Sequence, residues 1–556
     1  MKKRFVSRQE IENSRFEVCV IGGGATGSGC ALDAQLRGLR TVLVEAGDFA
    51  SATSSSSTKL IHGGVRYLEQ AVSDRDLAQY HVVKRALRER RLMLDNAPFL
   101  AHPLELLVPC FSRRDIYYFR AGMKLYDWLS GRNKLFPSRY LSAPESLRHM
   151  PMLNPDGLAG TISYADGQFD DARYNLALLQ TLAQCGGTSL NYARVVGFDK
   201  QSDGQLAEAH VRDECTGERF TVRAQAFINA TGPFADGIRE LAHPGVECRL
   251  RRSKGSHILL PADALASAKA LLVPKTDDGR VIFAIPWLGR LLVGTTDEEA
   301  ASAEEMAVEQ EEAEYLLRHL NRYLVRPLRR EQIVSGFAGV RPLVAPVDGC
   351  ETRKLIRDHE VEADVSSGLI SVLGGKWTTY RAMAEDAVNT VQKRFRIGLR
   401  PCTTRKQQLF GSEGWEPNFW VTLVKDYGVS NETAGHLSGK FGTAARKVLD
   451  LAMHESKLIQ PIVEGMPYIG AEVVYNAREE MATSIEDVLA RRIGLQLFSW
   501  VGAIAAAPAV GSLLAGELGW SSAEQKSAVD KYRHQVYRLM TRLGLEPGHL
   551  PAAGVR

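Results

Sequence analysis

The sequence has few of the features that mark metal-binding, disulfide-linked or nucleic-acid-binding proteins. Its eight cysteines include no C-x-x-C pair and no two that lie close together, so a zinc ribbon, a thioredoxin-type site and a local iron–sulfur loop are unsupported. We therefore expect reduced thiols and no metal site. The 69 basic residues and 65 acidic residues leave a net charge of +4, which is too small to indicate a nucleic-acid partner.

Apolar segments that would carry the chain across a membrane are either missing or interrupted. The first fifteen residues, MKKRFVSRQEIENSR, are charged throughout, so we expect no secretory signal and a location inside the cell. The 24 residues from Ile493 to Gly516 carry no formal charge and are long enough to span a bilayer. This run also contains four glycines, six alanines and Pro508. We therefore predict two buried helices joined near Pro508 instead of a membrane span.

The first 400 residues alternate between strand-like and helix-like segments. Residues 16–21, FEVCVI, are typical of a buried strand, and a glycine-rich turn, a helical pattern and the strand-like run TVLVEA come after it, which together indicate a βαβ unit. Further strands are predicted at 226–231, 257–261, 280–286, 290–296 and 368–373, and helices at 70–96, 113–131, 172–185, 304–324 and 377–395. Beyond a linker near residue 400 the periodicity is helical. The sequence thus predicts an α/β region over 1–400 and an all-α domain over 401–556.

The glycine-rich turn has the spacing of a dinucleotide-binding site. Gly22, Gly24 and Gly27 form G-x-G-x-x-G directly after a predicted strand and at the start of a helix, where backbone N–H groups can face a pyrophosphate. Glu45 ends the next strand, where a carboxylate can bind an adenosine ribose. The turn lies at the N-terminus, a strand returns to a small-residue turn at Ala230, and no second G-x-G-x-x-G is present. These features resemble those of FAD-binding two-dinucleotide-fold flavoproteins, a resemblance that implies FAD without a second, nicotinamide dinucleotide.

Several longer segments identify a family. The extended turn IGGGATGSGCALDAQLRG (21–38) and GGKWTTYRAMA (374–384) resemble the two signatures of the FAD-dependent glycerol-3-phosphate dehydrogenases of the aerobic, quinone-linked type. Segments 53–69, 170–173, 229–236, 254–258, 294–297 and 339–343 are also similar to family segments, and the resemblance spans about residues 16–400. It implies a Rossmann-like two-dinucleotide-fold flavoprotein of the glutathione reductase or amino-acid oxidase type. The FAD-binding part and an α+β substrate subdomain would be interleaved in residues 1–400, before the helical C-terminal domain.

The resemblance implies oxidation of sn-glycerol 3-phosphate to dihydroxyacetone phosphate. This reaction needs a base for the hydroxyl, a hydride acceptor and cations for the phosphate. The candidate catalytic residues are His62, Arg341, Lys376 and Lys254, and the candidate substrate-binding residues are Arg66, Tyr67, Arg357 and His257. His62 and Lys376 both suit the role of base. The alternatives are a structural hydrogen bond for His62, solvent exposure for Arg66, a surface ion pair for Arg357, and a sheet edge for Lys254 and His257.

The candidate FAD-binding residues lie in six segments of the sequence. They are Gly22, Gly23, Gly24, Thr26, Gly27, Glu45, Ala46, Thr53, Ser54, Ser55, Ser57, Lys59, Gly63, Val195, Ala230, Thr231, Gly232, Gly375, Lys376, Trp377 and Thr378. Between Thr53 and Thr58 the composition alone is that of a flexible linker. Its place between Glu45 and the His62 turn favours hydroxyl contacts with the FAD phosphates and ribityl chain.

The composition of the C-terminal region narrows the choice of electron acceptor. Residues 403–556 contain no cysteine, so the cysteine-bearing module of the anaerobic relatives is absent, which leaves a membrane quinone or oxygen. On a helix over 113–131, Arg113, Arg120 and Lys124 form a basic stripe beside Tyr117 and Trp128, which suits an anionic lipid surface, although a solvated helix has the same pattern.

The resemblance also implies partners and a location. We expect a membrane quinone as acceptor, a homodimer, no nucleic acid, and a cytoplasmic enzyme peripherally bound to the inner membrane. The alternatives are a glycerol-3-phosphate oxidase that makes hydrogen peroxide, and a non-catalytic or tRNA-modifying flavin-binding protein.

Overall fold

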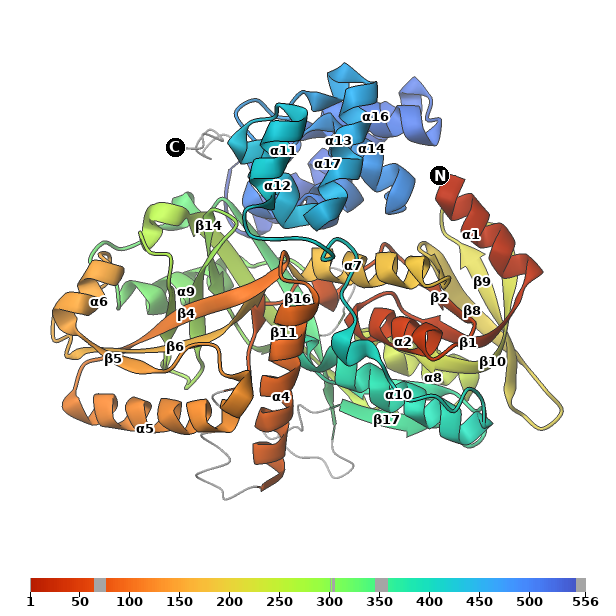
Figure 1. Cartoon of the computed structure of the whole chain (residues 1–556), viewed down its shortest axis with the longest axis horizontal. Coiled ribbons are helices and arrows are strands. Elements are labelled where there is room, and N and C mark those ends of the chain that lie inside the picture. The colour runs from red at the N-terminus through yellow and green to blue at the C-terminus, as the bar shows by residue number, and fades with distance from the viewer. Residues whose placement is uncertain (1, 65–76, 301, 303–305, 346–358, 547–556) are drawn as a thin grey trace.

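Two β-sheets form the framework of the molecule in the computed structural model, which describes residues 2–64, 77–300, 302, 306–345 and 359–546 (Figure 1). The first sheet has the strand order β17-β18-β10-β1-β2-β7, and β9 connects β8 to β10. Its strands are β1 (Arg15–Ile21), β2 (Thr41–Val44), β7 (Thr188–Leu190), β8 (Ala193–Lys200), β9 (Leu206–Asp213), β10 (Arg219–Asn229), β17 (His359–Ala363) and β18 (Ile370–Gly374). The parallel strands β1, β2, β10 and β18 bring segments hundreds of residues apart to one carboxyl edge.

The second sheet has the order β15-β11-β14-β13-β12-β4-β6-β3, with β16 on β11 and β5 on β6. Its strands are β3 (Leu60–Ile61), β4 (Ala101–Cys110), β5 (Arg139–Ser142), β6 (Gly160–Phe169), β11 (Leu250–Pro261), β12 (Ala270–Val273), β13 (Ile282–Trp287), β14 (Arg290–Gly294), β15 (Glu298–Glu299) and β16 (Ser335–Val344). Most of its pairings are antiparallel, β12 with β4 being the parallel exception among the described strands. The predicted combination of an α/β part with an α+β part is therefore confirmed.

Helices pack against both sheets and contribute to their hydrophobic cores. The helices of this part are α1 (Lys2–Asn13), α2 (Ala25–Leu36), α4 (Leu77–Asn96), α5 (Arg113–Ser130), α6 (Ala143–His149), α7 (Asp171–Gln184), α8 (Ala235–Ala242), α9 (Gln310–Asn321) and α10 (Tyr380–Phe395). Helices α2, α7 and α10 pack together over one face of the first sheet. Helix α5 packs its Met123, Tyr126 and Leu129 under the second sheet.

The chain beyond residue 419 is helical, as expected. It contains α11 (Phe419–Tyr427), α12 (Asn431–Phe441), α13 (Ala445–His454), α14 (Gly470–Glu479), a π-helix (Asp487–Arg492), α15 (Leu495–Phe498), α16 (Trp500–Leu518) and α17 (Ser522–Arg542), which lie together above the sheets in Figure 1. Several of these helices share a hydrophobic core with the second sheet and α9. The division of the chain at residue 400 stays a prediction.

The predicted break at Pro508 is wrong. Helix α16 runs through Pro508, and the chain bends before it, at Ser499, whose hydroxyl accepts a hydrogen bond from the Gly502 N–H. A proline leaves the carbonyl four residues earlier without its helical donor. Here that carbonyl belongs to Ile504, and Arg533 of α17 donates to it at 3.4 Å. The packing of α17 thus satisfies a group that proline would otherwise leave unpaired.

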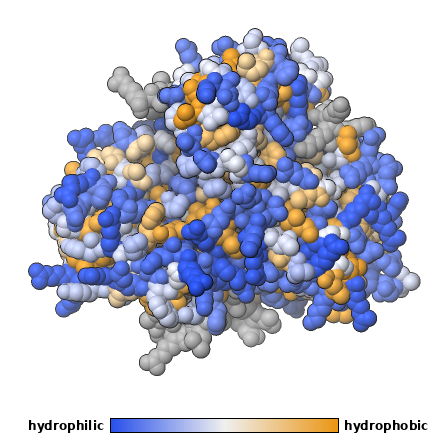
Figure 2. Space-filling view, viewed as in Figure 1, coloured by the Kyte–Doolittle hydropathy of each residue, from blue (hydrophilic) through white to orange (hydrophobic). Residues whose placement is uncertain are grey.

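Helix α16 is also the one helix among the described residues with the length and apolar composition to cross a membrane. Forty-four per cent of its apolar window is buried inside the molecule, where it packs against α14 and α17. Hydrophobic residues elsewhere are scattered among hydrophilic ones over the face shown in Figure 2. Burial among the C-terminal helices therefore accounts for part of this uncharged run.

Candidate active site

The turn between β1 and α2 is built from glycines because other segments approach its backbone closely. Gly22 has a φ of +108°, and a Cβ there would lie 2.6 Å from the carbonyl oxygen of Ala230, which follows β10. A Cβ at Gly24 would lie 2.8 Å from Ser54 Oγ. Gly24 is also the N-cap of α2 and provides no side chain to cap it. The turn is thus a cradle of backbone at a helix N-terminus, the kind of place where proteins bind phosphate groups. Of the predicted contacts, Gly23 lies in this turn, Thr26 and Gly27 lie in the first turn of α2, and Thr231 and Gly232 lie in the turn after β10.

Glu45 closes one end of the cradle, directly after β2. Its carboxylate accepts hydrogen bonds from the Gly23 N–H at 2.6 Å and the Gly47 N–H at 2.8 Å. Burial raises the pKa of Glu45, although these two bonds oppose the shift. Ala46 comes next in the chain, and Val195 is buried in β8 with its side chain in the core, so a ligand contact from Val195 would come from its backbone.

The segment from Thr53 to Lys59 connects the glycine turn to the second sheet. Ser54 Oγ accepts from the Ala25 N–H at 2.9 Å, and the Ser54 carbonyl accepts from Trp377 Nε1 at 2.8 Å. Thr53 Oγ1 donates to the Val340 carbonyl at 2.6 Å. Thr58 Oγ1 lies 2.9 Å from His257 Nε2. This segment therefore brings the α2 N-terminus, the Trp377 turn and strands β11 and β16 to one place, and it is no flexible linker.

Two of the predicted contacts in this segment bind protein groups instead of facing open space. Lys59 is 1% exposed, and its ammonium donates to Asp171 Oδ1 at 2.5 Å and to the Ser55 carbonyl at 2.7 Å. Ser57 Oγ donates to Asp171 Oδ2 at 2.7 Å. Asp171, the first residue of α7, is the buried anchor of the segment. Burial raises the pKa of Asp171, and the charge of Lys59 opposes that shift.

Strands β11 and β16 place Arg341 and His257 on one face of the second sheet. In their antiparallel register Arg341 lies opposite Ser253, and His257 lies opposite Phe337, on which its ring stacks with centroids 4.7 Å apart. Residues two apart in a strand share a face, so both pairs point the same way. Gly255, Gly294 and Gly339 underlie this face, and a Cβ at Gly339 would lie 2.7 Å from the side chain of Ser56. These glycines let the Thr53–Lys59 segment and both side chains lie against the sheet.

The guanidinium of Arg341 is held in a fixed orientation by the loop after β14. It donates to Thr295 Oγ1 at 3.0 Å, to the Thr296 carbonyl at 3.2 Å and to Asp297 Oδ1 at 3.2 Å. Its side chain is still 30% exposed. The positive group is therefore both oriented and accessible.

His257 is a neutral imidazole in this surrounding. Burial lowers its pKa well below the usual range, and the charges of Arg341 and Lys59 lower it further. Its Nδ1 has no hydrogen-bond partner among the described residues, although the side chain is buried. A buried polar atom without a partner beside Arg341 fits a site completed by a ligand.

Lys254 does not join this group. It lies three residues from His257 in β11 and therefore points to the opposite face of the sheet. There its ammonium donates to Glu312 of α9 at 2.7 Å, and the carboxylate also accepts from Ser256 Oγ at 2.7 Å. The geometry assigns Lys254 a structural ion pair.

The turn after β18 brings Lys376 to the same region. Gly374 and Gly375 have φ values of +70° and +90°, and Lys376 is the N-cap of the short helix Trp377–Thr379, which includes Thr378. The indole of Trp377, which donates to Ser54, packs edge-on against Phe169 and Tyr174. Lys376 is thus held beside the Thr53–Lys59 segment.

The turn after β3 holds His62 and Gly63. The Gly63 N–H donates to Tyr126 Oη at 2.8 Å, and this phenol donates to Asp166 Oδ1 at 2.7 Å. Arg66, Tyr67 and Arg357 lie outside the described residues.

The chain is similar over most of its length to known flavoenzymes. Residues 17–388 match the family model for FAD dependent oxidoreductases, and residues 402–525 match the C-terminal domain of alpha-glycerophosphate oxidase. The mitochondrial glycerol-3-phosphate dehydrogenase of Bos taurus is 40% identical, with 94% of this chain and 73% of the relative covered. The mitochondrial enzyme of the same name from Arabidopsis thaliana is 41% identical, with 93% and 85% covered.

The chain belongs to the FAD-dependent glycerol-3-phosphate dehydrogenase family. A solved member, the glycerol-3-phosphate dehydrogenase from Bacillus halodurans complexed with FAD, has a TM-score of 0.80 and 28% identity, with 96% of this chain and 97% of that chain covered. L-alpha-glycerophosphate oxidase from Mycoplasma pneumoniae has a TM-score of 0.54 at 19% identity and covers 68% of this chain, a likeness that shows the fold alone.

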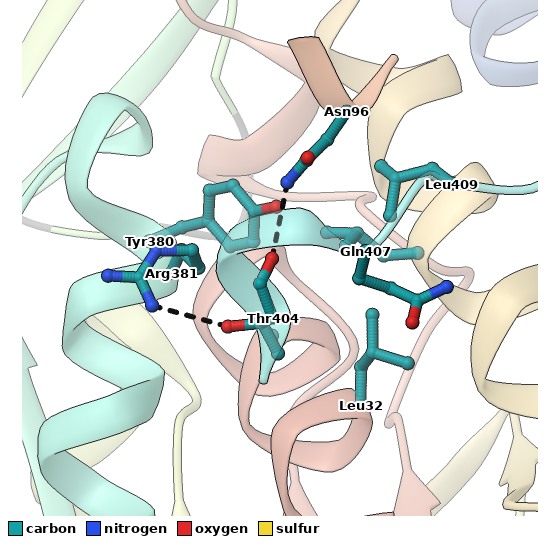
Figure 3. A pocket seen from close by; sticks show the side chains of 9 residues that line it. Leu32, Asn96, Tyr380, Arg381, Thr404, Gln407 and Leu409 are labelled. Atoms are coloured by element: carbon teal, nitrogen blue, oxygen red, sulfur yellow. Dashed lines mark hydrogen bonds between the residues drawn. The ribbon is translucent and has the colours of Figure 1, made fainter. Parts of the chain in front are cut away.

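The residues present fit the FAD of this family. The glycine cradle, Glu45 and the Thr53–Lys59 segment form a continuous series of backbone donors and polar side chains from the ribose end to the second sheet. Away from this series, a cavity lined by Leu32, Asn96, Tyr380, Arg381 and Thr404 has room for about one water molecule (Figure 3). It lies under the 404–409 linker, where Arg381 and Asn96 bind Thr404, and it is separate from the site.

Four residues that support the site were not predicted from the sequence. Asp171, Thr295 and Asp297 lie in DDAR and GTTD, two segments that are similar to the family, so that similarity was the available signal. Tyr126 lies in a predicted helix, and only the fold shows that its hydroxyl meets Gly63.

Proposed function

We propose that this chain oxidises sn-glycerol 3-phosphate to dihydroxyacetone phosphate. The single observation that carries the proposal is the convergence of the glycine cradle, the Trp377 turn and the Arg341 face on the Thr53–Lys59 segment. On this proposal the flavin end of a bound FAD would lie beside the oriented guanidinium of Arg341. Relatives named glycerol-3-phosphate dehydrogenase, 40–41% identical over nearly the whole chain, support the same substrate.

The proposed roles of the residues follow from the proton and the hydride that the reaction removes from the substrate. Oxidation of the C2 alcohol removes a proton from the hydroxyl and a hydride from the carbon, and FAD supplies the hydride acceptor. Arg341 binds substrate oxygens through its accessible fork. His62 and Lys376 remain the two candidates for the proton acceptor, and His257 contributes a neutral hydrogen-bonding nitrogen next to Arg341.

Anaerobic reduction tests the substrate. Purified holoenzyme is mixed with glycerol 3-phosphate without oxygen, and the flavin absorbance is followed in a stopped-flow instrument. We expect full bleaching with release of one dihydroxyacetone phosphate per FAD, and no bleaching with glycerol, which lacks the phosphate that Arg341 and its neighbours would bind. Absence of bleaching by glycerol 3-phosphate would exclude the proposal.

A membrane quinone is the acceptor that we propose for the electrons. The competing acceptor is oxygen, which the match of residues 402–525 to the C-terminal domain of alpha-glycerophosphate oxidase favours. Steady-state turnover with a short-chain quinone and with oxygen separates them. Rapid quinone reduction with little hydrogen peroxide supports the first, and stoichiometric hydrogen peroxide without quinone turnover supports the second.

Helix α5 supports a peripheral contact with an anionic membrane. Arg113 and Arg120 are exposed, and so are Tyr117 at 71% and Trp128 at 68%. Large exposed aromatic side chains next to arginines are typical of surfaces that enter the headgroup layer. Lys124 is less available than the sequence implied, because its ammonium donates to the Ser138 carbonyl at 2.6 Å. On this basis we propose that the enzyme binds to the cytoplasmic face of the inner membrane, and from the resemblance to the family we also propose a homodimer.

Charge reversal on α5 tests the membrane contact. The double variant Arg113→Glu, Arg120→Glu should lose most of its binding to vesicles with anionic lipid while it keeps its activity with a soluble dye. The matched control reverses Lys526 and Lys531 on α17, which lies far from α5 in Figure 1. Equal vesicle binding of both variants and the parent would remove the proposal, and light scattering of the detergent-free protein tests the dimer.

A further inference from the structure

Buried charges tie the C-terminal helices to the segment that carries Glu45. Asp48, three residues after Glu45, is 2% exposed, and its carboxylate accepts hydrogen bonds from Arg492 at 2.6 and 2.7 Å and from Arg491 at 2.6 Å. Arg492 is fully buried. Both arginines belong to the π-helix Asp487–Arg492, more than 440 positions further along the chain.

The same helices hold the turn that lies beside Glu45. Tyr192 Oη donates to Asp487 Oδ1 at 2.7 Å, and Asn191 Nδ2 donates to the Met481 carbonyl at 2.9 Å. This turn leads into β8, where the Ala193 N–H donates to the Glu45 carbonyl at 2.7 Å. The segment that follows Glu45 and the turn at Asn191 and Tyr192 are therefore both connected to the π-helix or to the residues just before it.

A third connection reaches the helix beneath the glycine cradle. Arg173 of α7 forms a bidentate pair with Glu480 at 2.7 and 2.9 Å, and Lys440 of α12 donates to Asp170 at 2.6 Å. Two residues on from Arg173, Asn175 Nδ2 donates to the Gly23 carbonyl at 2.8 Å. Helix α7 lies directly under the C-terminal helices in Figure 1.

From these three connections we propose that the C-terminal helices are a clamp that holds the adenosine half of the FAD site in its binding shape, with Arg492 as the central positioning residue. The inference rests on the proposed placement of the adenosine ribose at Glu45. A hydrophobic contact alone would attach the helices to the rest of the chain. The charged contacts described here instead fall on the segments next to Glu45 and the glycine cradle.

The electrostatics of Asp48 agree with a clamp. Burial alone would raise the pKa of this carboxyl, but the charges and hydrogen bonds of Arg492 and Arg491 lower it to about 2. Without Arg492 a charged carboxylate would be buried with fewer partners, and the segment that carries it would have to open toward water. Opening would move Glu45 away from the glycine cradle.

Replacement of Arg492 tests the clamp in the full-length holoenzyme. The variant Arg492→Met keeps much of the side-chain length and removes the charge. We expect FAD to dissociate on dilution at concentrations at least tenfold above those of the parent, measured by flavin fluorescence, and ADP to compete for the site at least tenfold more weakly. The rate of flavin reduction by glycerol 3-phosphate at saturating FAD, and its substrate dependence, should stay within twofold. The control Arg478→Met removes an exposed ion pair with Glu517 in the same helices and should leave all four quantities unchanged.

Two further variants keep the test decisive. Arg492→Lys retains the charge without the bidentate fork and should give an FAD affinity between those of the parent and Arg492→Met. This variant provides the test if Arg492→Met fails to fold. Glu45→Ala tests the placement of the adenosine ribose at Glu45 independently of the clamp. Weaker FAD binding in Glu45→Ala together with parental FAD and ADP affinities in the Arg492 variants would overturn the clamp alone. Parental FAD affinity in Glu45→Ala would overturn the placement on which it rests.

Discussion

Removal of the Arg341 guanidinium should cost the enzyme most of its efficiency while FAD stays bound. The guanidinium lies on the open face of β16 and is oriented by Thr295, Thr296 and Asp297. Because it is already oriented, little side-chain entropy is lost when the substrate binds. Two charge-assisted hydrogen bonds to substrate oxygens would be worth about 3–6 kcal/mol in a dry site.

The side chain is 30% exposed, so solvent reduces that value. We take about 3 kcal/mol as the loss for Arg341→Ala, which corresponds to roughly a 150-fold fall in kcat/KM. Arg341→Lys keeps a point charge without the fork and should lose roughly tenfold. Steady-state kinetics with a soluble dye measures kcat/KM, and the flavin-to-protein ratio shows that FAD is retained.

Arg252 provides the matched control for this prediction. It lies in β11 opposite Pro342, next to the Ser253–Arg341 pair, and points to the other face of the sheet, where it donates to the Pro233 carbonyl at 3.3 Å. Arg252→Ala should change kcat/KM by less than about threefold, in line with a lone surface hydrogen bond. The reasoning fails if Arg341→Ala keeps parental efficiency or if both variants lose the same amount.

Three other predictions concern FAD binding and stability. Burial raises the pKa of Glu45, so this carboxylate takes up a proton at a higher pH than an ordinary glutamate, and FAD affinity should fall as the pH drops into that range. Glu45→Gln should bind FAD more weakly at neutral pH, and its affinity should not depend on pH in this way. A fluorescence titration of FAD binding over pH 5–8 compares the pH dependence of the two proteins. Asp171→Asn leaves the buried Lys59 charge without its carboxylate partner, so we expect the free energy of unfolding to fall by about 3–5 kcal/mol, which calorimetry shows as a lower unfolding temperature. Asp95→Asn breaks an exposed pair with Arg91 and should leave the unfolding temperature unchanged. Pro508→Ala should stabilise the protein by less than the ~3 kcal/mol that a proline in a helix interior usually costs, because α17 already satisfies the carbonyl it leaves; a gain of the full amount in urea unfolding would contradict this account.

The parts of the fold that are local in sequence were predictable, and those that depend on distant partners were not. The βαβ unit of β1, α2 and β2 is encoded in its own apolar runs and glycines. Strand β6 was not predicted, because its buried face includes the polar residues Asp166 and Gln168. These are satisfied by Arg90, 76 positions away, and by the carbonyl of Pro286, 118 positions away. A polar residue whose partner is so remote looks like a surface residue in the sequence.

The same limit applies to the candidate site. Glu45 was recognisable because it lies 22 positions from the turn it serves, within one supersecondary unit. The partners of Arg341 depend on the register between β11 and β16, which no local pattern fixes. The sequence could have predicted that Lys254 and His257 lie on opposite faces of the sheet, because residues three apart in any strand do so.

The interleaved order of the first sheet has a consequence for how the protein is made. β1 pairs with β2 soon after both leave the ribosome, but its other neighbour, β10, ends at Asn229, about 210 residues after β1 ends at Ile21. At a synthesis rate of 5–20 residues per second this interval is roughly 10–40 s. During that time one side of β1 presents unpaired backbone groups that can join other strands. The nascent chain should therefore depend on chaperones until the β10 segment has been made, and fragments that end before it should be recovered as aggregates, whatever their cofactor supply.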